Sequence, residues 1–201
     1  MIRTARAVIA LGTLALVTAC GEKKDENAMG DSTAMAMGGT TAAAEPAMAP
    51  ASGGMTDANI VWVVSTANKG EIERGNIAST KGTNAAVKTY GKMIVGEHTA
   101  LETEAQALAA KLGVTPMMPS GDMTEMNAKQ QMDTFNSTAK GAGWDKAYID
   151  YELTYHQQLM ETAKAAIAAT QNGELKALLE KAAPIVQKHI DEAMALQKKM
   201  M

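Results

Sequence analysis

The sequence has 201 residues, a formal net charge of −3 at neutral pH and an aromatic content of 3%. The length is sufficient for one domain of ordinary size with terminal segments. A mildly acidic chain has little attraction for the phosphate backbone, and so few aromatic side chains cannot form a stacking surface for bases or sugars. Nucleic acid is therefore excluded as an expected partner.

Residues 1–19 have the composition of a secretory signal peptide. Arg3 and Arg6 precede an apolar run from Ala7 to Val17. This run is too short to span a bilayer core of about 30 Å, whereas a positive start followed by a short apolar stretch is typical of a signal peptide removed on export. Its removal would change the formal net charge from −3 to −5.

Cys20 is the predicted lipidation site. The stretch Val17-Thr18-Ala19-Cys20 resembles the bacterial lipobox, in which the cysteine is diacylated and becomes the new N-terminus. Lipid on Cys20 would attach the chain to a membrane without a transmembrane helix. By resemblance to lipoprotein sorting, Gly21 favours the outer membrane, facing the periplasm, over the inner membrane of the bacterial cell envelope. The alternative is an ordinary signal peptide cleaved near Ala19, which would leave a free thiol.

Residues 20–55 are predicted to form a disordered tether. After the lipidation site the segment consists mainly of Ala, Gly, Met, Thr, Ser and Pro and has no aromatic residue, so it cannot bury enough apolar area to offset its chain entropy. The chain has sixteen methionines, and pairs such as Met35 and Met37 place thioethers close together. Thioethers select Cu(I), so a copper-binding tail is one hypothesis, and methionine as a filler is the other.

Residues 56–201 are predicted to form one all-α domain. Long stretches rich in Ala, Leu, Lys, Glu and Gln carry apolar residues at helical spacing, and Gly and Pro residues separate them. The expected helices cover about Asp57 to Ser79, Asn84 to Leu112, Met123 to Ala139, Trp144 to Thr170 and Glu174 to Lys199. Amphipathic helices with short connections pack antiparallel, which predicts an up-down four-helix bundle with the shorter helix in the middle connection.

The sequence has three histidines, and each lies on the apolar face of a different expected helix. His98 follows Tyr90 and Ile94, and His156 and His189 occupy equivalent places in the fourth and last helices. Three imidazoles are thus expected to point toward the core. The alternative is three separate core or half-exposed histidines, each hydrogen-bonded to a carboxylate or to a tyrosine such as Tyr90, Tyr151 or Tyr155.

Several glutamates share these faces. Glu71 lies on the predicted buried face of the first helix and is a candidate fourth ligand, while Glu97, Glu152 and Glu192 lie within one turn of a histidine as candidate second-layer partners. Facing imidazoles and carboxylates are how helical bundles build metal sites, so a divalent transition metal is the possible cofactor. No histidine has a glutamate three residues before it, which argues against a di-iron centre and favours a mononuclear one. No catalytic residue is predicted.

Four stretches carry a resemblance to a known family: Gly70 to Ala78, Val87 to His98, Trp144 to His156 and Pro184 to His189. Together they resemble the bacterial domain-of-unknown-function family usually labelled putative outer membrane protein. The resemblance covers about residues 56–201 and implies a ferritin-like fold, with histidines at the positions of His98, His156 and His189 and an acidic residue at Glu71. It implies no reaction. Arg74 stands where the family usually has an apolar residue, and Glu97 where it commonly has aspartate.

Three functional hypotheses follow. The first is a lipid-anchored, non-enzymatic envelope protein that binds a metal ion or an unidentified protein partner. The second is a metal-dependent enzyme with a His/Glu centre, which would need an open coordination position and a cleft leading to it. The third is a purely structural or stress-protective envelope protein. Convergence of His98, His156, His189 and Glu71 within about 5 Å in the fold would favour the metal hypotheses over the third.

Overall fold

The computed structural model describes residues 54–201, which form five α-helices: α1 (Asp57–Lys81), α2 (Ala85–Leu112), α3 (Thr124–Ser137), α4 (Ala142–Ala169) and α5 (Gly173–Met200). The prediction of an all-α bundle is confirmed, and each helix begins and ends within two residues of its predicted bounds. The predicted signal peptide, the lipidation site at Cys20 and nearly all of the predicted tether lie outside the described residues.

Polar side chains cap the first turns of α1, α2 and α5. Thr56 caps α1 through a reciprocal pair of hydrogen bonds with Asn59, and Asn84 and Asn172 cap α2 and α5 in the same position. Each cap satisfies backbone N–H groups that have no partner within the helix. Gly113 ends α2 in the left-handed conformation, with φ of 63°, which glycine adopts without a steric penalty. These caps explain why the sequence defined the bounds so closely.

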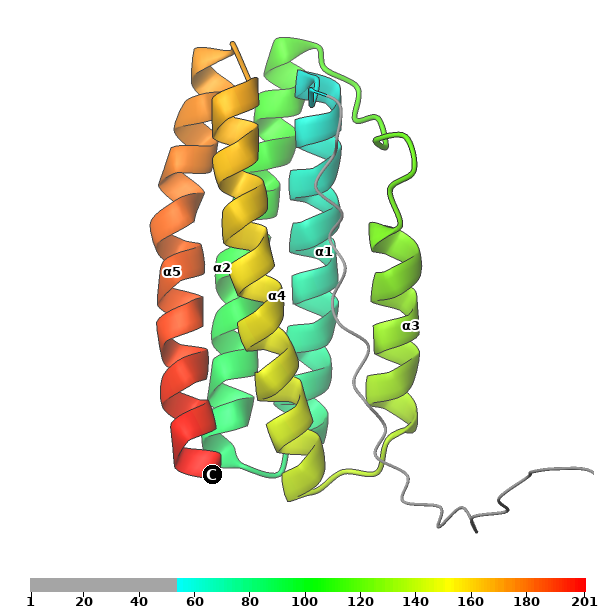
Figure 1. The fold of residues 1–201 in the computed structure, drawn as a ribbon, viewed down its shortest axis with the longest axis vertical. Helices are drawn as coiled ribbons and strands as arrows, with labels where there is room; N and C mark the ends of the chain where they lie inside the picture. Colours follow the sequence, from blue (N-terminus) through cyan, green and yellow to red (C-terminus); the bar gives the residue numbers. More distant parts are fainter. Residues whose placement is uncertain (1–53) are drawn as a thin grey trace, which may run out of the picture. The chain divides into compact units, whose positions relative to one another are not determined.

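Two antiparallel hairpins make up the bundle. One consists of α1 and α2, the other of α4 and α5, and they pack together mainly through α2 against α5 (Figure 1). The carboxylate of Asp145, in the first turn of α4, accepts hydrogen bonds from the backbone N–H groups of Thr83 and Asn84, so it ties the α1–α2 turn to the second hairpin. Each helix pair therefore has a fixed position relative to the other.

The fifth helix lies outside the four-helix core. Figure 1 shows α3 beside α1, in a long connection that brings the chain back along the bundle, so that α2 and α4 run in the same direction. The α3 helix joins the core at its C-terminal end, where Phe135 packs against Trp144 and Tyr148. Among residues 54–201, no helix combines the length and apolarity needed to cross a membrane.

A polar layer divides the core in two. One apolar cluster is aliphatic and surrounds Ile60, Leu175 and Leu179, and the other is rich in aromatic side chains. Along the four long helices, five buried polar residues lie in sequence between members of the two clusters: Glu71, Arg74, His98, His156 and His189. Glu152 lies one turn before His156, within the aromatic cluster. Burial of this many polar groups is costly without partners, so a functional site is expected in this layer.

The α1 and α2 helices come unusually close together at two glycines. A Cβ atom added to Gly91 would lie 2.7 Å from the carbonyl oxygen of Gly75 and 2.8 Å from Cβ of Ala78. Since backbone atoms cannot rotate away as a flexible side chain can, this contact depends on the absence of side chains. The close contact sets the position of α1 against α2. It therefore also sets the position of the buried polar residues of α1, which follow Ala67 in the sequence.

A Gly91→Ala variant is expected to lower the free energy of unfolding by about 1–3 kcal/mol, because the added methyl group forces α1 and α2 apart. Gly96 is the matched control, since it lies on the same helix, is exposed and has no atom within 4 Å of an added Cβ. Gly96→Ala is expected to stabilise by up to about 1 kcal/mol. Urea denaturation of both variants measures the difference, and equal effects would contradict the close contact.

Candidate metal centre

Three imidazoles from three helices meet in the polar layer. His98 comes from α2, His156 from α4 and His189 from α5, and none is more than 1% exposed. One ring nitrogen from each histidine lies within 4.8 Å of one from each of the others. The convergence expected from the sequence is therefore present, and the alternative of three separate core histidines is not what the fold contains.

Each imidazole has one nitrogen with an outward hydrogen-bond partner. Nδ1 of His98 lies 2.8 Å from Oδ1 of Asn68, and Nδ1 of His156 lies 2.9 Å from the carbonyl oxygen of Glu152. Nε2 of His189 lies 2.7 Å from a carboxylate oxygen of Glu97. All three partners are acceptors, so each of these nitrogens carries the proton.

The remaining three nitrogens are then unprotonated in the neutral imidazoles. Nε2 of His98 is buried and has no hydrogen-bond partner. Nε2 of His156 and Nδ1 of His189 are 3.1 Å apart, so their lone pairs face each other. Two lone pairs at that distance repel unless a proton or a metal ion lies between them.

Burial disfavours the proton. Desolvation lowers the pKa of His98 well below its ordinary value of 6.5, and the charges that His156 and His189 would carry lower it further. Desolvation also lowers the pKa of His156. It lowers the pKa of His189 to about 4, although Glu97 acts to raise it. At neutral pH the cluster is thus uncharged, with lone pairs available for a cation.

Glu97 connects the cluster to solvent. Its side chain is 30% exposed and accepts hydrogen bonds from both His189 and Lys188, the latter with an Nζ–Oε1 distance of 2.5 Å. Burial alone would raise the pKa of Glu97, but these two partners lower it overall. An ionised Glu97 fixes the proton of His189 on Nε2, which keeps Nδ1 directed at the other imidazoles.

A second polar group lies beside the histidines. Arg74 donates to a carboxylate oxygen of Glu71 at 2.6 Å and to one of Glu152 at 2.9 Å, with all three side chains at most 1% exposed. The guanidinium also lies 4.1 Å from the ring centroid of Tyr155, in cation–π geometry. Oε1 of Glu71 is 3.6 Å from Nε2 of His156, so the two groups adjoin.

The charges of this second group nearly balance. Desolvation, aided by the neighbouring charge of Glu71, raises the pKa of Glu152 to about 8, so Glu152 is mostly protonated at neutral pH. Burial would lower the pKa of Arg74, but the two glutamates outweigh burial and raise it. Burial also raises the pKa of Glu71, and the cation of Arg74 opposes that rise, so it offsets carboxylate charge in this group. Glu71, Glu152 and His156 have metal-like spacing, but Arg74 already supplies the positive charge there.

The predicted glutamates differ in how they lie relative to the three histidines. Glu97 and Glu152 are hydrogen-bond partners of histidines, as second-layer residues would be. Glu71 adjoins His156 but is held by Arg74 and does not belong to the three-histidine group. Glu192 lies on the exposed side of α5, away from both groups.

Sequence reasoning missed two residues of the site. Arg74 is fully buried, although the sequence suggested no role for it, and Asn68 is the partner of His98. Both lie three residues from Glu71, one on each side, so the helical period that selected Glu71 also contained them. An arginine three residues after a glutamate on a buried face was the available signal.

Comparison with known proteins gives a family and no activity. Neither the curated proteins nor the solved structures contain a match to this chain. A family model does match, over residues 40–196, which include every residue of the three-histidine group and its partners. The chain therefore belongs to the family described as Domain of unknown function (DUF4142).

Proposed function

We propose that this protein binds a divalent transition metal through His98, His156 and His189. The observation that carries the proposal is the orientation of the imidazoles: each gives its N–H to an outer acceptor. The free nitrogens of His156 and His189 then face each other, and that of His98 is buried without a partner. Metal-binding histidines have this arrangement, because the outer acceptor fixes the tautomer and makes the inner nitrogen a better ligand.

The distance between two of the imidazoles suits a shared transition-metal ion. Zinc–nitrogen bonds of about 2.0–2.1 Å place tetrahedral ligand nitrogens about 3.3 Å apart, close to the 3.1 Å between Nε2 of His156 and Nδ1 of His189. Imidazole ligands also suit copper, iron and nickel. Three histidines leave one coordination position, for which Glu71 is the nearest carboxylate; a Glu71→Gln variant that binds metal as tightly as wild type would remove Glu71 from the ligand set.

The proposed setting is the bacterial cell envelope. The predicted signal peptide and the lipobox-like stretch ending at Cys20 support attachment to a membrane through lipid, with Gly21 favouring the outer membrane. A protein that stores or buffers a metal ion at that membrane, or protects the envelope against an excess of the ion, needs a metal-binding site of this kind. It needs no catalytic residue. The enzyme hypothesis keeps one supporting observation, a cavity that reaches His98.

The test is metal content of the full chain, purified in mild detergent without an affinity tag, beside a triple variant with His98, His156 and His189 changed to alanine. Wild type is expected to carry one metal per chain and the variant none. At about 1,000-fold excess over the dissociation constant, added metal is expected to stabilise wild type by about 4 kcal/mol, or raise its melting temperature by about 10 °C.

Two further variants make the result specific. Glu192→Ala changes an exposed carboxylate one turn from His189 and is expected to bind metal as wild type does. His98→Gln keeps the size of the side chain, and circular dichroism reports whether it folds, so loss of metal in a folded variant is interpretable. A wild type without metal, whose melting temperature does not rise with Zn²⁺, Cu²⁺ or Fe²⁺, contradicts the proposal.

A further inference from the structure

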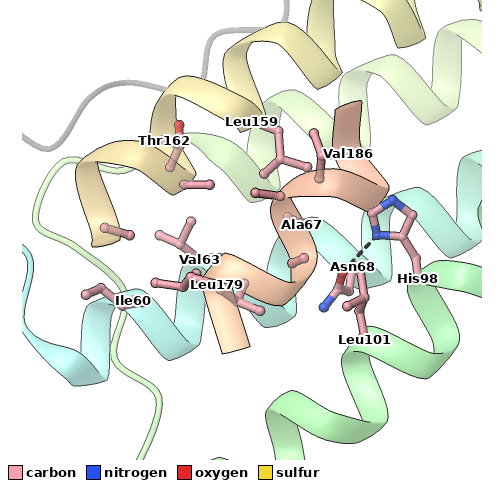
Figure 2. Close-up of a pocket in the computed structure, with 15 residues that line it drawn as sticks. Ile60, Val63, Ala67, Asn68, His98, Leu101, Leu159, Thr162, Leu179 and Val186 are labelled. Carbon is pink, nitrogen blue, oxygen red and sulfur yellow. Dashed lines mark hydrogen bonds between the residues drawn. The ribbon is translucent and has the colours of Figure 1, made fainter. Parts of the chain in front are cut away.

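A cavity of about 50 Å³, partly open to solvent, lies between the helices of the bundle beside the three-histidine group. Its walls come from α1, α2, α4 and α5, as Figure 2 shows, and most of them are aliphatic: among the residues that line it are Val63, Ala67, Leu101, Leu159, Leu179 and Val186. Only Asn68, His98 and Thr162 contribute polar side chains. The cavity is thus an apolar space with a polar boundary at the three-histidine group.

The amide of Asn68 gives this boundary a free donor. Its Oδ1 accepts from His98, and Figure 2 shows Nδ2 turned away from the imidazole. Nδ2 is buried and has no hydrogen-bond partner. A buried amide N–H group without a partner carries a free-energy cost, which an acceptor atom in the cavity would relieve.

Water fits this space poorly. A buried water molecule usually makes about three hydrogen bonds, whereas the wall offers few polar groups, and apolar cavities remain dry and take up apolar molecules instead. The size sets a second limit. A cavity of about 150 Å³ accommodates benzene, so a cavity one third as large accommodates about two or three heavy atoms, which excludes an acyl chain.

We propose that the cavity is the binding site for a small apolar molecule of about two or three heavy atoms, such as a diatomic gas, held beside the metal centre with an acceptor atom directed at Asn68. Entry is between α4 and α5, where Ala163 and Ala182 line the cavity and are partly exposed. The claim that this molecule is the substrate of a bound metal rests on the proposed function. The claim that the cavity binds a small molecule does not depend on the proposed function.

Xenon tests the cavity without any metal. Methyl NMR spectra of the full chain, in detergent with a chelator, are recorded under increasing xenon pressure. Saturable shifts are expected for the methyl groups of Val63, Leu179 and Val186, and an Ala163→Leu variant, which fills the cavity, is expected to abolish them. The matched control is Ala165→Leu on the exposed side of α4, which is expected to bind xenon as wild type does.

A second filling variant, Ala182→Leu on α5, protects the test against a misfolded first one. Wild type without saturable shifts, or filling variants that bind xenon as well as Ala165→Leu does, overturns the proposal. Metal content measured on the same samples separates the two ideas: metal without xenon binding overturns the cavity site alone, and xenon binding without metal overturns the proposed function alone. Asn68→Leu is expected to weaken binding of nitric oxide more than that of xenon, because only nitric oxide offers an acceptor.

Discussion

Replacement of Arg74 by methionine is expected to lower the free energy of unfolding by about 3–5 kcal/mol, a large part of the total for a domain of this size. Arg74 is the only cation within hydrogen-bond distance of Glu71 and Glu152 among the described residues. Its loss leaves a buried carboxylate without a partner, and a charge in that position costs far more than the packing that methionine restores.

Two companion variants identify the cause. Lys69→Met removes a positive charge from the same helix, but Lys69 is 62% exposed and its ion pair with Glu102 spans 3.7 Å, so the loss is expected to stay below about 1 kcal/mol. Adding Glu71→Gln to Arg74→Met removes the unpaired charge and is expected to recover part of the stability. Chemical denaturation measures all three, and an Arg74→Met variant no less stable than Lys69→Met would contradict the charge network.

Glu152→Gln is expected to make the metal-free protein more stable than wild type at pH 8, and equal to it near pH 4.5. The carboxyl of Glu152 has a pKa of about 8 in the fold and an ordinary value of 4.5, so the native state holds its proton more tightly than the unfolded state. The stability due to that proton is complete below pH 4.5 and is lost as the pH rises through 8. Glutamine remains neutral throughout and still accepts from Arg74.

The expected difference between the two proteins grows to at most about 5 kcal/mol at pH 8 and then levels off. The groups facing Glu152 are Glu71 and Arg74 on α1 and His156 on its own helix. The lowered pKa of the histidines acts in the opposite direction, since it removes stability as the pH falls below about 6.5. The histidines, and Glu71 with its own raised pKa, are present in both proteins, so the difference reports mainly Glu152. Thermal denaturation with chelator from pH 4.5 to 9 measures it, and a constant difference would refute it.

The sequence was sufficient for the helices and for the three histidines. Helix caps such as Thr56 and helix-ending residues such as Gly113 act over a few residues, so they can be recognised from the sequence alone. The histidines lie on apolar stripes, and a stripe predicts burial wherever the helix finally packs. Their convergence needed one further fact, that their three helices bring them to the same height in the bundle, and the similar helix lengths made this a reasonable expectation.

The sequence was insufficient for the partners of those histidines. Whether Glu97 or Glu192 faces a histidine depends on how α2 and α5 are rotated against each other, which no pattern within one helix determines. Glu97 bonds to His189 from a different helix, whereas Glu192, one turn from His189 on its own helix, faces solvent. Arg74 was missed for a related reason: a buried cation makes sense only once the two carboxylates it bridges, from different hairpins, are seen together.

Because the bundle consists of two hairpins, an ion bound by the three histidines would also affect how the bundle opens. His98 belongs to the α1–α2 hairpin, while His156 and His189 belong to the α4–α5 hairpin, so an ion bound by all three would join halves of the bundle that are distant in sequence. Separation of the hairpins would then require the ion to leave first. Local opening of one hairpin exposes its backbone to hydrogen exchange and to proteases. With the ion bound, the two hairpins would open together in one cooperative event, whereas α3, which provides no ligand, would still open by itself.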